Sequence, residues 1–308
     1  MKKIAVLESV PFSEEQKKRL SSLGDVEYCD YGEDIALEAA IEKTKNRDVV
    51  VVNWIDPSPF ILSMKENSLV SLLSTGYGWI QNMAESRKKG VLVTNIPAYA
   101  TEAVAEHIIG LLLSHVKGIA VSSNQSRVGK KSPPGSELKG KIIGIIGLGN
   151  IGSRVAELAQ AFGMGIITYN RSKKHKSMVA DVTLNELLSG SDIICITCPL
   201  NDQSRGLING SNIGFVKHGA ILAGATWGVV EEAALKSALA DGRIGGVAYD
   251  LALEGSEKLQ STELLELPNF LCTFHNAYNT VEAAERQRDI CINNIEMFLK
   301  GEPMNVVN

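Results

Sequence analysis

Three glycines near the middle of the chain have the spacing of a phosphate-binding turn. Gly147, Gly149 and Gly152 form the pattern G-x-G-x-x-G. The first glycine of such a pattern permits a tight turn, the second lets the backbone approach a pyrophosphate, and the third lets a helix pack closely on a strand. A helix that begins at this turn would direct unpaired N–H groups at the phosphates.

The segments around this motif predict a strand, a turn, a helix and a second strand. Residues 142–146 (IIGII) are typical of a buried strand, residues 151–161 have helix-forming composition, and residues 166–169 predict the next strand. A glycine triplet alone is a weak signal, but a triplet between strand and helix is a strong one. The context favours a dinucleotide site over a glycine-rich turn without a ligand.

The end of the second predicted strand indicates which dinucleotide is bound. An NAD site usually carries Asp or Glu there, which binds the ribose 2′-hydroxyl. This chain has Asn170, Arg171 and Ser172 instead, and Arg171 follows Gly152 by 19 residues. Because a guanidinium binds a phosphate bidentately, we predict that NADP(H) is preferred over NAD(H). The alternative is that these residues form a solvated basic turn.

The elements that must position this site belong to an α/β chain of two domains. The chain has 308 residues, of which 44% are hydrophobic and 21% charged, as in ordinary globular proteins. A second βαβ series starts at Lys141, after a long helix at 101–119 and a loop-like segment at 122–140. This alternation predicts doubly wound parallel sheets covered by helices. In the first hundred residues, strands at 3–7, 26–28 and 48–53 alternate with helices at 13–23, 35–44 and 63–73.

Composition excludes several classes of function. The formal net charge of −4 gives no overall attraction to nucleic acid or to an anionic membrane. No run approaches the roughly 20 apolar residues of a membrane span. Five cysteines and the lack of a signal peptide favour a reducing, cytoplasmic location. The five histidines show no metal-binding spacing, so we expect no metal site.

At this point the motifs resemble those of the D-isomer-specific 2-hydroxyacid dehydrogenases, of the glycerate, glyoxylate and phosphoglycerate dehydrogenase type. This resemblance implies two Rossmann-like domains with a cleft between them, and usually a homodimer. The dinucleotide-binding domain would span 101–278, and a substrate domain would combine 1–100 with 279–308. The similar segments cover most of the chain and include STGYGWI (74–80), GVLVTNIPAYATEAVAEH (90–107), ELKGKIIGIIGLGNIG (137–152), SDIICITCPLNDQSRGLIN (191–209), VVEEAALKSALADGRIGGVAYDL (229–251) and LPNFLCTFHNAYNT (267–280).

The resemblance also implies which residues contact the cofactor. They lie in the glycine motif and its helix, at the end of the following strand, in the loops after later strands, and in the helix that opens the domain. The residues implied are Val104, Gly147, Gly149, Asn150, Ile151, Gly152, Asn170, Arg171, Ser172, Cys198, Pro199, Thr226 and Asp250.

The family's catalytic residues match this chain only in part. Catalysis in the family uses a His as proton donor or acceptor, a Glu that hydrogen-bonds this His, and an Arg that clamps the substrate carboxylate. In LCTFHNAYNT, His275 takes the position of the His, although Phe274 replaces the usual Pro. Glu254 lies one residue short of the position of the Glu, so it serves only if its loop shifts.

The family's Arg has no counterpart in this chain. Counting from Gly219 places Trp227 at its position, and counting back from Leu235 places Thr226 there. Neither residue carries a positive charge, so the charge-assisted clamp on a carboxylate is missing.

Tryptophans fall at several positions that the resemblance places in loops facing the cleft. Trp54, Trp79 and Trp227 do so, together with Tyr77 and Gly78. A core role is the ordinary alternative for each Trp. We expect a pocket lined by aromatic side chains, suited to a carbonyl or imine of a flat apolar or a cationic substrate. Two other hypotheses for the function are an ordinary 2-oxoacid reductase with a substituted clamp and a non-catalytic NADP(H)-binding sensor.

Overall fold

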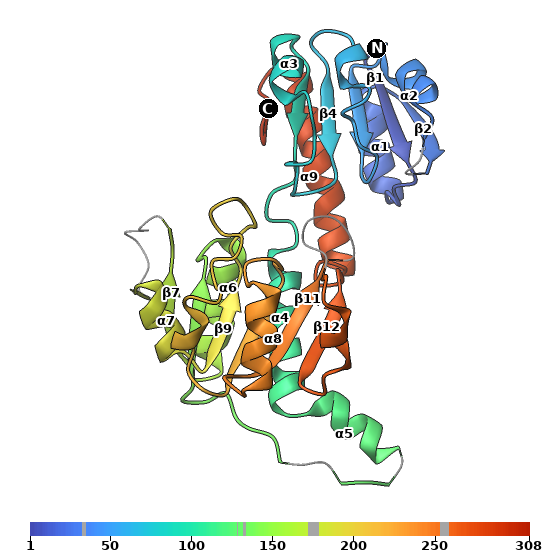
Figure 1. Cartoon of the computed structure of the whole chain (residues 1–308). Helices are drawn as coiled ribbons and strands as arrows, with labels where there is room; N and C mark the ends of the chain where they lie inside the picture. Colours follow the sequence, from blue (N-terminus) through green and yellow to red (C-terminus); the bar gives the residue numbers. More distant parts are fainter. Residues whose placement is uncertain (33–34, 128, 132–133, 172–178, 253–258) are drawn as a thin grey trace. The chain divides into compact units, whose positions relative to one another are not determined.

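A computed structural model of the chain describes residues 1–32, 35–127, 129–131, 134–171, 179–252 and 259–308. The described residues form two compact units, each built around one parallel sheet with helices on both faces (Figure 1). Unit 1 comprises Met1–Ala100 and Val281–Asn308, and unit 2 comprises Thr101–Thr280. Unit 2 is therefore inserted between the two segments of unit 1.

The sheet of unit 1 has five strands in the order β2-β1-β3-β4-β5. The strand order reverses between β1 and β3, and in open parallel sheets ligands bind beyond the carboxyl ends of the strands at such a point. The elements are β1 (Lys3–Glu8), α1 (Glu14–Leu23), β2 (Asp25–Tyr31), α2 (Leu37–Thr44), β3 (Val49–Val52), η1 (Ile61–Ser63), β4 (Leu69–Leu72), α3 (Met83–Lys88), β5 (Leu92–Thr94) and α9 (Val281–Leu299).

Alternating strand residues give unit 1 two apolar cores, one on each face of the sheet. Ile4 and Val6 of β1 belong to the cluster that contains Ile292 of α9. Ala5 and Leu7 point the other way, into the cluster that includes residues of α2 and η1. This period of two is the geometry of a strand that is buried on both faces.

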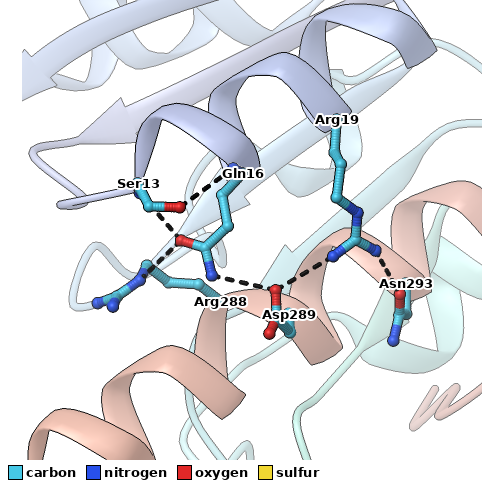
Figure 2. A network of polar contacts seen from close by, with 6 residues as sticks. All are labelled: Ser13, Gln16, Arg19, Arg288, Asp289 and Asn293. Carbon is cyan, nitrogen blue, oxygen red and sulfur yellow. Dashed lines mark hydrogen bonds and ion pairs between the residues drawn. The ribbon is translucent and has the colours of Figure 1, made fainter.

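Polar contacts join α9 to the first helix of the chain (Figure 2). The carboxylate of Asp289 accepts hydrogen bonds from the side-chain amide of Gln16 (3.0 Å) and from the guanidinium of Arg19 (3.1 Å). Arg288 donates to Gln16 Oε1 (3.0 Å), and Arg19 also donates to Asn293 (2.7 Å). The helix that follows unit 2 is thereby part of unit 1.

The sheet of unit 2 has seven strands in the order β12-β11-β10-β9-β6-β7-β8, with its reversal between β6 and β9. Helices α4 and α6 pack on one face, and α7 and α8 on the other. The elements are α4 (Thr101–Val116), α5 (Ile119–Ser126), β6 (Ile142–Ile146), α6 (Asn150–Ala161), β7 (Gly165–Tyr169), β8 (Ala180–Asp181), α7 (Leu184–Gly190), β9 (Ile193–Ile196), η2 (Ile213–Phe215), β10 (Ala220–Gly224), α8 (Glu232–Ala240), β11 (Ile244–Leu251), η4 (Thr262–Glu266) and β12 (Phe270–Phe274).

Two of the predicted elements are wrong. Residues 63–73, expected as a helix, contain strand β4, whose four residues are all buried. A short apolar run buried on both sides has no periodicity that separates strand from helix. The segment expected as a loop from residue 122 begins inside helix α5, because Gly118 (φ +62°) breaks the preceding helix and a new one starts after it.

Candidate functional site

The glycine motif forms the turn between β6 and α6, and each glycine has a different steric reason to be there. A Cβ on Gly147 (φ +97°) would lie 2.6 Å from the backbone nitrogen of Cys198. A Cβ on Gly152 would collide with the carbonyl oxygen of Gly147 and lie 2.7 Å from Thr197 Oγ1. A Cβ on Gly149 would meet no atom within 4 Å. The backbone at Gly149 therefore faces open space, as a cradle for a pyrophosphate requires.

A cavity of about 280 Å³ lies beside this turn, beyond the carboxyl ends of β6, β7 and β9. The reversal of strand order between β6 and β9 makes this edge the expected ligand site of the unit. The cavity brings together many of the predicted cofactor residues, and its lining is Ile146, Gly147, Leu148, Gly149, Tyr169, Asn170, Arg171, Thr197, Cys198, Pro199, Asn201, Gln203, Ser204 and Leu207.

Asn170 and Arg171 line the cavity just after the end of β7. The side-chain oxygen of Asn170 accepts the N–H of Leu148 (2.6 Å), so it braces the glycine turn. Arg171 is exposed, lines the cavity, and donates to the side-chain oxygen of Gln203. Sequence reasoning missed Gln203, because its contact with Arg171 spans 32 residues. A guanidinium beside this cavity fits a 2′-phosphate.

The other predicted cofactor residues lie outside this lining. Asn150 and Ile151 are in the first turn of α6, and Val104 is buried in α4. Thr226 follows β10, and its carbonyl oxygen accepts the hydroxyl proton of Tyr249 (2.6 Å). Asp250 lies near the carboxyl end of β11 and is 4% exposed. Ser172 and Glu254 lie outside the described residues.

His275 follows β12, at the same edge of the sheet as the cavity, because all seven strands are parallel. Its side chain is exposed, and its ring meets that of Tyr278 edge-on with the ring centroids 5.3 Å apart. Its backbone N–H donates to the carbonyl oxygen of Leu251 (2.8 Å). An exposed imidazole on a fixed turn is suited to give or take a proton.

Trp227 does not line a pocket, and the structure corrects that expectation. It is 3% exposed and belongs to the core of unit 2, with its ring edge-on to those of Tyr249 and Phe270. Its indole N–H donates to Glu232 Oε1 (2.7 Å), because a buried indole needs a hydrogen-bond acceptor. A tryptophan at this depth cannot replace a carboxylate-clamping arginine.

Glu232, which sequence reasoning missed, connects Trp227 to a distant loop. Its carboxylate also accepts the N–H of Gln260 (2.9 Å) and that of Ser261 (2.7 Å). Partial burial alone would raise the pKa of Glu232, but the hydrogen bonds from Trp227, Gln260 and Ser261 outweigh it and lower that pKa. Through Glu232, the segment after β10 that contains Trp227 is thus fixed to the loop at Gln260 and Ser261.

In unit 1, the remaining expected residues stand at the carboxyl edge of the sheet. Trp54 follows β3 and is 53% exposed, and Tyr77, Gly78 and Trp79 are exposed in the loop after β4. Since β3 and β4 are neighbours, the two loops lie at the same edge. The hydroxyl of Ser58 accepts the N–H of Gln81 (2.8 Å) and so joins them.

Glu8 fixes the loop that carries Trp54. Glu8 ends β1, and its buried carboxylate accepts the N–H groups of Asn53, Trp54 (2.6 Å) and Ile55 (3.3 Å). These contacts lie at the reversal of strand order between β1 and β3. A carboxylate of the chain itself therefore binds the N–H groups of this loop, while the side chain of Trp54 stays exposed.

Within the described part of the chain, no group of three or more His, Cys, Asp or Glu is arranged to hold a metal ion. Within the same residues, no single helix is long and apolar enough to span a membrane. Only by taking the bent pair α4 and α5 together do these residues reach the length and apolar composition of a span. Most of the apolar residues of α4 are buried in unit 2.

The thiol of Cys195 is fully buried in unit 2. This burial raises the pKa of Cys195 to about 12, which keeps the thiol protonated.

Fold and site together define a two-unit Rossmann-like protein with a dinucleotide cradle in unit 2. Residues 109–277 match the family model for the D-isomer specific 2-hydroxyacid dehydrogenase, NAD binding domain. The chain is 32% identical to the hydroxypyruvate reductase of Blautia hydrogenotrophica, over 94% of each chain. It therefore belongs to the D-isomer-specific 2-hydroxyacid dehydrogenase family, a family of oxidoreductases.

Other relatives and solved structures agree with this membership. The glycerate dehydrogenase of Methylorubrum extorquens is 30% identical over 91% of this chain and 92% of its own. An acyclic imino acid reductase, solved with NADPH and D-Arg, is 28% identical with a TM-score of 0.85, over 99% of this chain and all of its own. A glyoxylate reductase from Paecilomyes thermophila, at 23% identity over 99% of this chain and 98% of its own, shares the fold with the same TM-score.

Proposed function

We propose that this protein is an NADPH-dependent reductase of a carbonyl or imine whose substrate carries an aromatic, apolar or cationic group. The observation that carries the proposal is the lack of a positive charge where the resemblance puts the carboxylate-clamping Arg, since the two counts place either Thr226 or the buried Trp227 there. Trp54, Tyr77 and Trp79, exposed on two joined loops of unit 1, are suited to apolar and cation–π contacts with such a group. The similarity to a reductase of acyclic imino acids supports the imine.

The described residues fit a nicotinamide dinucleotide. Gly149 presents the open backbone that a pyrophosphate needs, and Arg171, which lines the same cavity, would supply the positive charge for a 2′-phosphate. When bound, the reduced cofactor supplies a hydride. His275 gives a proton to the carbonyl oxygen or imine nitrogen of the substrate.

Replacing Arg171 by Ala should weaken NADPH and leave NADH almost unchanged. The variant loses a charge-assisted hydrogen bond to the 2′-phosphate, which contributes about 1.5–3 kcal/mol, or roughly 10- to 100-fold in affinity. Fluorescence titration with both cofactors measures this. Arg127→Ala, at an exposed arginine that follows α5, is the matched control. Wild-type protein that binds NADH as tightly as NADPH would contradict the preference.

A substrate panel tests the reaction. We expect faster NADPH oxidation with phenylpyruvate, or with 2-oxo acids that bear a cationic side chain, than with glyoxylate or hydroxypyruvate. Excess methylamine, which converts the 2-oxo acid into its imine, should raise the rate further. Turnover confined to small 2-oxo acids would favour an ordinary 2-oxoacid reductase with a substituted clamp. Tight NADPH binding without turnover of any compound would favour a non-catalytic sensor.

A further inference from the structure

His275 has a backbone conformation that residues other than glycine rarely adopt. Its φ is +47°, in the left-handed region. For a residue with a Cβ this conformation costs about 1–2 kcal/mol, so it persists only where neighbouring groups fix it. The groups that fix this turn therefore also determine the direction in which the imidazole of His275 points.

Consecutive N–H groups of the turn are bound by the neighbouring strand β11. The N–H of His275 donates to the carbonyl oxygen of Leu251 (2.8 Å). The next two, those of Asn276 (3.1 Å) and Ala277 (2.9 Å), donate to the carboxylate of Asp250. The resemblance to the family assigns Asp250 to the cofactor, but these contacts direct its oxygens to the backbone of the His275 turn.

The carboxylate of Asp250 is in turn held by Thr273 and His107. Thr273 lies opposite Asp250 in the pairing of β11 with β12, and its hydroxyl donates to Asp250 Oδ1 (2.6 Å). Because that proton is given to Asp250, the hydroxyl oxygen accepts from Nε2–H of His107 (2.8 Å). His107 belongs to α4, which packs against both strands.

We propose that Thr273 and His107 are positioning residues for catalysis, which act on His275 through Asp250. A buried carboxylate must be hydrogen-bonded, and its donors decide where its oxygens point. The chain from His107 to Thr273 to Asp250 aims this carboxylate at the two N–H groups after His275 and so fixes the direction of the imidazole. The proposal rests on the proposed function, in which His275 transfers the proton.

Substitutions at Thr273 test the positioning role. Thr273→Val keeps the β-branched shape of the strand residue and removes the hydroxyl, whereas Thr273→Ser keeps the hydroxyl. Misplacing a catalytic group by about 1 Å costs on the order of 100-fold. We therefore expect Thr273→Val to lower kcat about 10- to 100-fold, with the KM of the panel's best substrate and NADPH affinity within about threefold of wild type. Thr273→Ser should restore kcat to within about threefold.

Two further variants complete the series. His107→Phe should lower kcat in the same way, and His107→Gln, which keeps an N–H donor, should restore part of it. Thr168→Val is the matched control, because Thr168 is a buried strand threonine of the same sheet whose hydroxyl lies 3.4 Å from the carbonyl oxygen of Ala180. This control should keep its kcat.

Amide hydrogen exchange reports on the turn independently of activity. In Thr273→Val, the N–H groups of Asn276 and Ala277 should exchange at least about tenfold faster, and in Thr168→Val they should be unchanged. Unchanged exchange in Thr273→Val, or a wild-type kcat in Thr273→Val while His275→Asn is inactive, would overturn the positioning role. A fully active His275→Asn would instead overturn the proposed function. If no compound is turned over, the exchange measurement still shows whether Thr273 fixes the turn that carries His275.

Discussion

Replacing His275 by Asn is expected to lower kcat for NADPH-dependent reduction by about 10²- to 10⁴-fold, the range that a positioned acid or base contributes. Asn is the informative substitution, because it tolerates the positive φ of this position better than most residues. The turn is thereby preserved while the proton donor is lost. Steady-state kinetics, with NADPH affinity measured in parallel, tests this result.

The exposed His218 of the same unit offers a matched control. His218→Asn should leave kcat and the KM values as they are in the wild type. If His275→Asn retained kcat within about threefold of wild type, the proton would have to come from another group. His275 would then have no part in the chemistry.

Alanine at two glycines of the β6–α6 turn is expected to separate cofactor binding from folding. Gly149→Ala places a methyl group in open space on the surface that faces the pyrophosphate, so the fold should be unaffected and NADPH should bind at least about tenfold more weakly. Gly152→Ala forces a methyl group against the Gly147 carbonyl and Thr197, and such overpacking costs about 1–3 kcal/mol. This second variant should unfold at a lower temperature.

Thermal unfolding without cofactor, combined with NADPH titration, distinguishes the two effects. Gly110→Ala is a suitable control, because Gly110 lies in helix α4 and a Cβ there meets no atom within 4 Å. Wild-type NADPH affinity in Gly149→Ala would mean that the pyrophosphate does not approach the backbone at this turn.

The parts of the molecule that local sequence determines could be predicted. The strand, glycine turn and helix around Gly147 are encoded within about twenty consecutive residues, and the structure contains them as expected. The predicted family and α/β fold are confirmed. They too could be predicted from local sequence, because each motif is a continuous segment. The clustering of Asn170 and Arg171 beside the glycine turn followed from parallel strand order.

The parts that distant contacts determine could not be predicted. Trp227 was assigned by counting along a loop to a pocket, but its environment is set by Tyr249, Phe270 and Glu232, which come together only in the folded sheet. Glu8 binds a loop 45 to 47 residues further along the chain, and no spacing rule signals such a partner.

The insertion of unit 2 within unit 1 has a consequence for the order of events at the ribosome. All of Thr101–Thr280 is synthesised before α9, so the dinucleotide-binding unit has its whole sequence available first. Until α9 is synthesised, one face of the sheet in residues 1–100 is covered only in part, because Cys291, Ile292 and Ile295 of α9 complete the core to which Leu20 of α1 contributes. The core of unit 1 is thus completed after the sequence of unit 2 has been synthesised, and until then its uncovered apolar residues are prone to aggregation.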